Sequence, residues 1–85
     1  MGLVNAVVPT ADLMAEARRW AETLCRCGPL ALRAAKEAML RGRELPLAEG
    51  LELEHRLFNS LAYSEDVREG LAAFAERRPP QFKGE

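Results

Sequence analysis

The distribution of strand-forming residues restricts this chain to a fold that is almost entirely helical. Its 85 residues include 14 Ala, 13 Leu and 10 Arg, which are strong helix formers, and no Ile. Three of the four Val lie within the first eight residues. We therefore expect a mainly α fold class, in which one short N-terminal strand is followed by about four helices.

The start of the chain predicts that strand and the beginning of the first helix. Residues 3–8 are rich in Val, and Pro9 cannot continue a β-ladder. Thr10 and Asp12 are both suitable N-cap residues. Apolar residues then recur at helical spacing, which predicts a first helix over about 12–26.

Glycine and proline mark the limits of the second and third helices. Gly28 and Pro29 separate the first helix from a second, which we expect over 29–41. The second helix carries a face of small residues made of Ala31, Ala34, Ala35 and Ala38, with Leu30 and Met39 beside it. Pro46 opens the third helix. Its apolar line contains Leu47, Leu51, Glu54, Phe58 and Leu61, flanked by Leu57.

A fourth helix is expected to begin after Ser64, because acidic residues in the first turns favour the positive end of a helix. Its predicted inner stripe contains Val67, Leu71 and Phe74. Arg77 and Arg78 stand at its negative end, before two prolines that stop it.

Charge and hydropathy exclude several kinds of partner. A formal net charge of −1 lacks the basic character of a nucleic-acid binder. No apolar run approaches the roughly 18–20 residues of a membrane span, and the first residues do not read as a signal peptide. We therefore expect a cytoplasmic protein without a nucleic-acid or membrane partner.

The sequence shows no constellation of catalytic or metal-binding residues. Cys25 and Cys27 have the wrong spacing for a redox pair and lack a second pair for zinc, so they are interpreted as reduced thiols. His55 has no defensible triad partner and is expected at the surface. Glu54 interrupts an apolar line, which predicts a partner arginine, backbone N–H groups or a subunit seam.

One cluster suggests a binding role. Phe74, Arg77, Arg78 and Lys83 gather an aromatic ring and three cations around the end of the last helix. Arginine and lysine can hold a phosphate, and an aromatic face can pack on an adenine or a pantetheine arm. The alternative is that Phe74 belongs to the core and that the arginines only offset the helix dipole.

Four segments together resemble the C-terminal part of the enoyl-CoA hydratase/isomerase (crotonase) family. They are GLVNAVVP (2–9), GPLALRAAKEAM (28–39), LAEGLELE (47–54) and SEDVREGLAAFAERRPPQFKG (64–84). Their order and spacing cover nearly the whole chain. The last is the most telling, because nothing about a generic helix requires that run.

The resemblance implies a division into residues 1–9, the end of the crotonase core, and residues 10–85, a C-terminal helical assembly domain. The family's catalytic glutamates and oxyanion hole would lie before Met1, so we expect no catalytic and no metal-binding residue here. The parent reaction would hydrate a 2-enoyl-CoA through a thioester enolate, with coenzyme A (CoA) thioester as substrate and no cofactor. Whether this chain is itself an enzyme stays open, and we do not expect it to catalyse the reaction alone.

The resemblance also implies partners and binding residues. Phe74 and Arg77 match the aromatic and basic positions that touch CoA in the family, commonly at a subunit boundary. A homo-oligomer is expected, a trimer or a dimer of trimers. Four short helices cannot cover the apolar faces, so the chain should self-associate. The alternative function is a free-standing four-helix acyl-CoA-binding or protein-interaction module.

Overall fold

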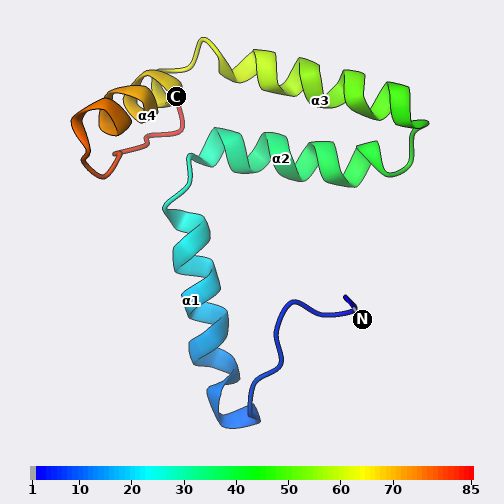
Figure 1. Cartoon of the computed structure of the whole chain (residues 1–85), viewed down its shortest axis with the longest axis vertical. Coiled ribbons are helices and arrows are strands. Elements are labelled where there is room, and N and C mark those ends of the chain that lie inside the picture. Colours follow the sequence, from blue (N-terminus) through cyan, green and yellow to red (C-terminus); the bar gives the residue numbers. More distant parts are fainter. Residues whose placement is uncertain (1) are drawn as a thin grey trace.

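The computed structural model describes residues 2–85 and consists of helices and their connections (Figure 1). A short 3₁₀ turn, η1 (Thr10–Asp12), leads into α1 (Leu13–Cys25). The remaining helices are α2 (Pro29–Gly42), α3 (Leu47–Leu61) and α4 (Glu65–Glu76). The mainly α architecture with four helices is thus confirmed, and the first two helices lie within one residue of their predicted ranges at each end.

The predicted helix starts are confirmed at α2, α3 and α4, whereas the predicted cap of α1 is wrong. Pro29 occupies the first turn of α2, where its missing N–H is not needed. The Ser64 hydroxyl accepts a hydrogen bond from the Val67 N–H at 3.2 Å and so caps α4. Asp12 makes no side-chain cap. Its place is taken by η1, in which the Asp12 N–H donates to the Pro9 carbonyl at 2.9 Å.

The N-terminal strand predicted over residues 3–8 is not formed within residues 2–85. A strand needs a neighbour to receive its backbone hydrogen bonds, and no other extended segment lies beside these residues. Leu3, Val4 and Val7 are all largely exposed. Met1, the first residue of the predicted 1–9 unit, lies outside the described residues.

Helices α2 and α3 form an antiparallel hairpin and run side by side (Figure 1). The two backbones approach most closely near the loop, where a Cβ on Gly50 would lie 3.2 Å from the Gly42 carbonyl oxygen. A side chain at position 50 would therefore push the helices apart. Leu53, only 4% exposed, lies on the same face of α3, one turn after Gly50.

The apolar line predicted for α3 does not face α2. Leu47, Leu51 and Phe58 are all more than half exposed, and the buried residue is Leu53, which that line omitted. Likewise, Leu71 and Phe74 of α4 are exposed, so the predicted inner stripe of α4 is wrong at two of its three positions. The packed face of α4 contains Asp66, Gly70 and Ala73 instead, because the chain beyond α4 folds back along that face.

The chain is flat and open. Its extents are 43 × 40 × 18 Å, and α1 projects away from the α2–α3 hairpin (Figure 1). The radius of gyration is 16.1 Å, against about 12 Å for a compact domain of this length. No helix within residues 2–85 combines the length and the apolar composition that crossing a bilayer requires.

Candidate functional site

The C-terminal end of α4 is shaped by a left-handed residue. Arg77 has φ 54° and ψ 43°, the conformation in which helices usually place a glycine. The Arg77 N–H donates to the Phe74 carbonyl at 3.3 Å, and the Arg78 N–H donates to the Ala73 carbonyl at 3.0 Å. These two bonds are the Schellman pattern of a helix end. The chain therefore reverses at Arg77 and runs back beside α4.

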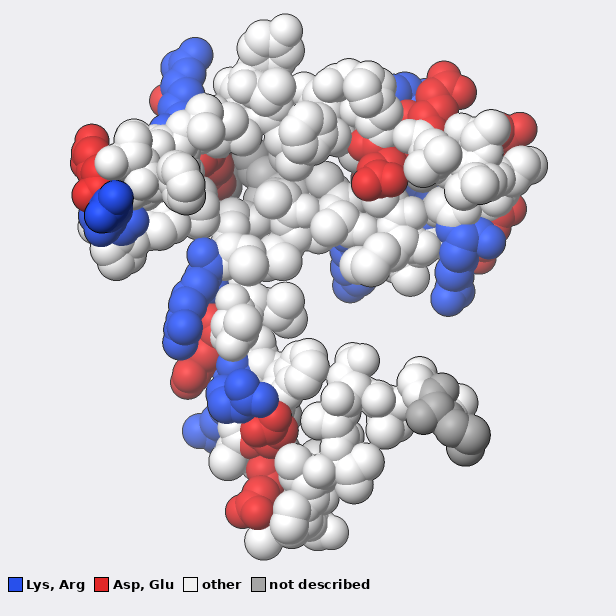
Figure 2. All heavy atoms as spheres, in the orientation of Figure 1, with Lys and Arg blue, Asp and Glu red and all other residues white. Residues whose placement is uncertain are grey.

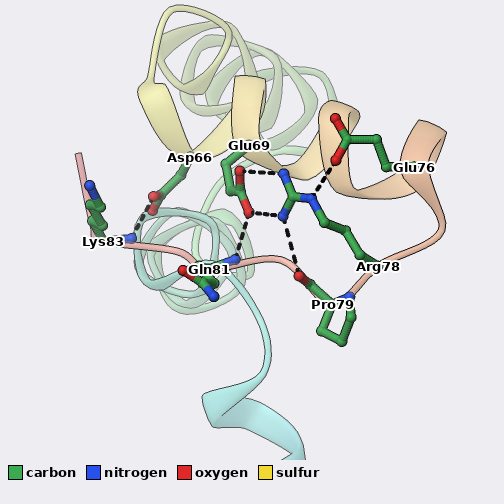
Figure 3. Close-up of polar contacts among 7 residues, drawn as sticks. All are labelled: Asp66, Glu69, Glu76, Arg78, Pro79, Gln81 and Lys83. Atoms are coloured by element: carbon green, nitrogen blue, oxygen red, sulfur yellow. Dashed lines mark hydrogen bonds and ion pairs between the residues drawn. The ribbon is translucent and has the colours of Figure 1, made fainter.

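An arginine fork ties the returning chain to the middle of α4 (Figure 3). Arg78 donates to both carboxylate oxygens of Glu69, with Nη1–Oε1 at 2.6 Å and Nη2–Oε2 at 3.0 Å. Its Nε donates to Glu76 at 2.6 Å, and the backbone N–H of Gln81 donates to the same Glu69 Oε1 at 2.8 Å. We call this set of contacts among Glu69, Glu76, Arg78 and Gln81 the Arg78 latch.

The latch lowers the pKa of Glu69 to about 2, chiefly through the hydrogen bonds from Arg78 and then through the Gln81 N–H. Glu69 and Glu76 together raise the pKa of Arg78. A carboxyl whose pKa falls on folding stabilises the fold above its unfolded pKa of about 4.3. That stabilisation is lost only as the pH drops towards 2, so both groups stay charged at neutral pH.

Asp66 holds the last residues of the chain on the first turn of α4. Its carboxylate is buried and accepts hydrogen bonds from the backbone N–H groups of Lys83 at 2.8 Å and Gly84 at 2.9 Å. The Asp66 N–H in turn donates to the Glu85 carbonyl at 3.0 Å. Between these anchors, the Phe82 ring lies beside Gly28 and Gly70, where a Cβ would come within 3.7 and 3.5 Å of the ring. The returning chain thus joins α4 to the start of α2.

The four members of the predicted cluster of Phe74, Arg77, Arg78 and Lys83 differ in whether their side chains are bound within the chain. Arg78 is committed to the latch, and the backbone of Lys83 is bound by Asp66. Phe74, by contrast, is 86% exposed, so the alternative that it belongs to the core is wrong. Arg77 is exposed, and no carboxylate within residues 2–85 forms an ion pair with it. Phe74, Arg77 and the exposed side chain of Lys83 are therefore the members of the cluster that remain available to a ligand.

A groove of about 890 Å³ runs along α2 and α3. Small residues of α2 and the apolar line of α3 supply its walls, among them Ala31, Ala35, Met39, Leu51, Glu54 and Phe58. Figure 2 shows a broad area without charged side chains across these helices, with charges mostly at its margins. Met39 and Phe58 are about two-thirds exposed, so the groove is an open surface rather than an enclosed ligand cavity.

The other polar candidates, Glu54, Cys25 and Cys27, are exposed. Glu54 is exposed on the groove and has no ion pair within residues 2–85, so the partner arginine that the sequence offered as one alternative is not found there. Cys25 and Cys27 are exposed and reduced, as predicted. Among the described residues, no group of three His, Cys, Asp or Glu side chains is placed to hold a metal ion.

Comparison with known proteins decides the family. The model of the enoyl-CoA hydratase/isomerase family matches residues 1–85, the whole chain. This chain belongs to that family. A probable enoyl-CoA hydratase of Mycobacterium tuberculosis is 52% identical over 81 residues, which are 95% of this chain and 32% of the relative. The 2,3-dehydroadipyl-CoA hydratase of Escherichia coli K12 is 43% identical over 83 residues, again 32% of that protein.

Solved structures agree with this family membership. The crystal structure of an enoyl-CoA hydratase from Bacillus anthracis superposes with a TM-score of 0.94 at 42% identity, covering 99% of this chain and 33% of that one. The chain thus spans about a third of the length of the relatives it matches, and the expected likeness to the C-terminal segment of the crotonase family is confirmed.

Proposed function

We propose that this chain is the C-terminal assembly and CoA-contact segment of an enoyl-CoA hydratase-like enzyme. Residues 1–9 would join it to the crotonase core, and residues 10–85 would form the helical assembly domain. The whole enzyme would hydrate a 2-enoyl-CoA through a thioester enolate, with its acid–base residues and oxyanion donors outside this chain. The helices would dock on the core and on neighbouring subunits, and no cofactor would be needed.

The observation that carries this proposal is the excess of exposed surface. The accessible area is 7508 Å², whereas a folded monomer of 9.4 kDa exposes about 5000 Å². A standard interface covers about 800 Å² on each partner. The excess is therefore large enough for docking on more than one neighbour.

The residues that form this excess surface are suited to a protein partner. Leu47, Leu51 and Phe58 of α3 form a continuous exposed line beside the small residues of α2. Burial of apolar area contributes roughly 25 cal/mol per Å², and small residues let a partner backbone approach closely. In an isolated chain this apolar face would be exposed to water, which is unfavourable in free energy.

Strain at Arg77 supports the CoA contact. A non-glycine residue in the left-handed conformation costs roughly 1–2 kcal/mol, and glycine would avoid that cost. Such outliers concentrate where a side chain has a function. Arg77 places a guanidinium at the exposed helix end, three residues after Phe74, whose ring is also exposed. CoA offers a phosphate for the first and an adenine for the second.

The experiment that tests this function is complementation. We would mix the chain with the remaining N-terminal two-thirds of the M. tuberculosis relative and follow the loss of the conjugated-thioester absorbance of crotonyl-CoA. Neither polypeptide alone is expected to turn over substrate, and the mixture is expected to do so. Leu51→Glu on the exposed line should abolish complementation, whereas the neighbouring Glu52→Gln should not.

Sedimentation of the same samples gives the second readout. The chain alone should sediment as a self-associated species at micromolar concentration, and the mixture should give a defined larger complex. Hydration of crotonyl-CoA by the chain alone, or a compact stable monomer that does not pair, would show the proposed role to be wrong.

Arg77→Gly is expected to stabilise the chain and to weaken the CoA contact. Removal of the left-handed strain should raise the free energy of unfolding by about 1 kcal/mol, measured by urea titration of the helical circular dichroism. In the complemented enzyme, the same change should raise KM for crotonyl-CoA. A variant that is less stable than the parent would contradict the assigned conformation of Arg77.

A further inference from the structure

The Arg78 latch encloses Arg77 between two fixed points. Glu76, on its N-terminal side, ends α4, and Arg78, on its C-terminal side, is gripped by both oxygens of Glu69 (Figure 3). Only one residue lies between these points. The Arg77 and Arg78 N–H groups are also bound to the Phe74 and Ala73 carbonyls, so the fork and these backbone bonds together restrict the φ and ψ of Arg77 and the direction in which its side chain leaves the backbone.

We propose that Glu69 and Arg78 are positioning residues that aim Arg77 at the phosphate of CoA, an inference that rests on the function proposed above. The two parallel N–H···O bonds of an arginine–carboxylate fork define an orientation as well as a distance, which a single-point ion pair does not. The Gln81 N–H adds a third bond to the same carboxylate at 2.8 Å. The latch thus opposes relaxation of the strained Arg77 backbone.

The latch also decides which cation meets the ligand. Arg78 carries the same charge as Arg77 and is its neighbour, so an unpaired Arg78 would compete for an anion. Glu69 and Glu76 both accept hydrogen bonds from its guanidinium, which neutralises it and occupies its donors. Arg78 is thereby withdrawn from competition with Arg77 for the phosphate.

The test is a titration of the isotope-labelled full chain with coenzyme A, followed by the amide shifts of Phe74 and Arg77. Pantetheine, which lacks the nucleotide phosphates, is the control ligand. Binding to the chain alone is expected to be weak, because the rest of the pocket belongs to other parts of the enzyme. Four proteins are compared: the parent chain, Glu69→Gln, Arg77→Gln and the double variant.

Glu69→Gln should weaken CoA binding about fivefold in the parent chain and should have no further effect in the Arg77→Gln background. It should lower the unfolding midpoint equally in both backgrounds. Glu65→Gln, which lies outside the latch and pairs only with Arg68, should change the affinity little. Arg78→Lys keeps the charge but replaces the fork by a single contact, so it should fold and still lose affinity.

The possible failures differ from one another. Absence of CoA-induced shifts at Phe74 and Arg77 in the parent chain would overturn the CoA contact and this inference together. Normal CoA binding in Glu69→Gln and Arg78→Lys, with only a lower unfolding midpoint, would overturn the positioning role and leave the proposed function intact. An equal loss of affinity from Glu69→Gln in both backgrounds would also overturn it.

Discussion

Replacing Leu53 by alanine is expected to unfold most of the α2–α3 hairpin. Leu53 is 4% exposed, and Ala73 is the other apolar residue of the described chain that is similarly buried. Truncation of a buried leucine costs about 3 kcal/mol, through lost burial and the cavity left behind. A chain with so few buried residues has little stability to lose. The helical circular dichroism of Leu53→Ala, followed through a urea titration, should show a much earlier transition or none.

Leu51→Ala is the matched control, because it makes the same change on the same helix at a site that is 55% exposed. In the chain alone it should move the transition by less than about 0.5 kcal/mol. In the complemented enzyme it should weaken assembly, since the exposed line of α3 is the proposed docking face. Equal destabilisation of the isolated chain by the two variants would mean that the packed face of α3 is not the one described.

Asp66→Asn has the second-largest expected effect, the release of the last residues from α4. The carboxylate accepts from the Lys83 and Gly84 N–H groups, one on each oxygen. Asparagine keeps one oxygen acceptor but turns its NH₂ group towards the other backbone N–H. One of the two part-buried N–H groups, of Lys83 or Gly84, therefore loses its acceptor. That costs about 2 kcal/mol. Hydrogen exchange at the amides of Lys83 and Gly84 should accelerate strongly, with loss of the Phe82 contacts on Gly28 and Gly70.

Glu65→Gln is the control for this variant. Glu65 precedes Asp66 and pairs only with Arg68 on the exposed side of α4, at 2.6 Å. Exposed pairs of this kind contribute little, so the exchange rates at the end of the chain should stay as in the parent. Unchanged exchange in Asp66→Asn would show that the carboxylate does not hold the returning chain.

The helices were predictable because the residues at their ends determine where each helix starts and stops. A Gly-Pro pair such as Gly28–Pro29 marks the boundary between two helices, and the Ser64 hydroxyl caps the start of α4. The strand over 3–8 failed for the opposite reason, since a strand depends on a partner segment that local residues do not reveal.

Packing faces were less predictable. The third helix carries leucines on two faces, one with Leu53 and Leu57 and one with Leu47 and Leu51. Periodicity shows that both are apolar but not which one the same chain covers. The resemblance to a larger family predicts that this chain by itself leaves such faces uncovered, and Leu47, Leu51 and Phe58 are exposed.

For the candidate site, the sequence predicted which residues to consider but not how they are arranged. Phe74 and Arg77 were singled out by their spacing and by the family pattern, and both are exposed. The Arg78 latch was missed, because Glu69 and Arg78 lie nine residues apart and meet only when the chain reverses at Arg77. The one available signal was the charge pair itself, and several other acidic residues would have been equally suitable partners.

Because the molecule is thin, its stability is expected to depend on protein concentration. At 18 Å, the chain is at most two helices deep, so scarcely any side chain is surrounded by its own polypeptide on every side. A partner that packs on either broad face would complete the interior there. Folding and association would then be one equilibrium, and the melting temperature would rise with the amount of protein present.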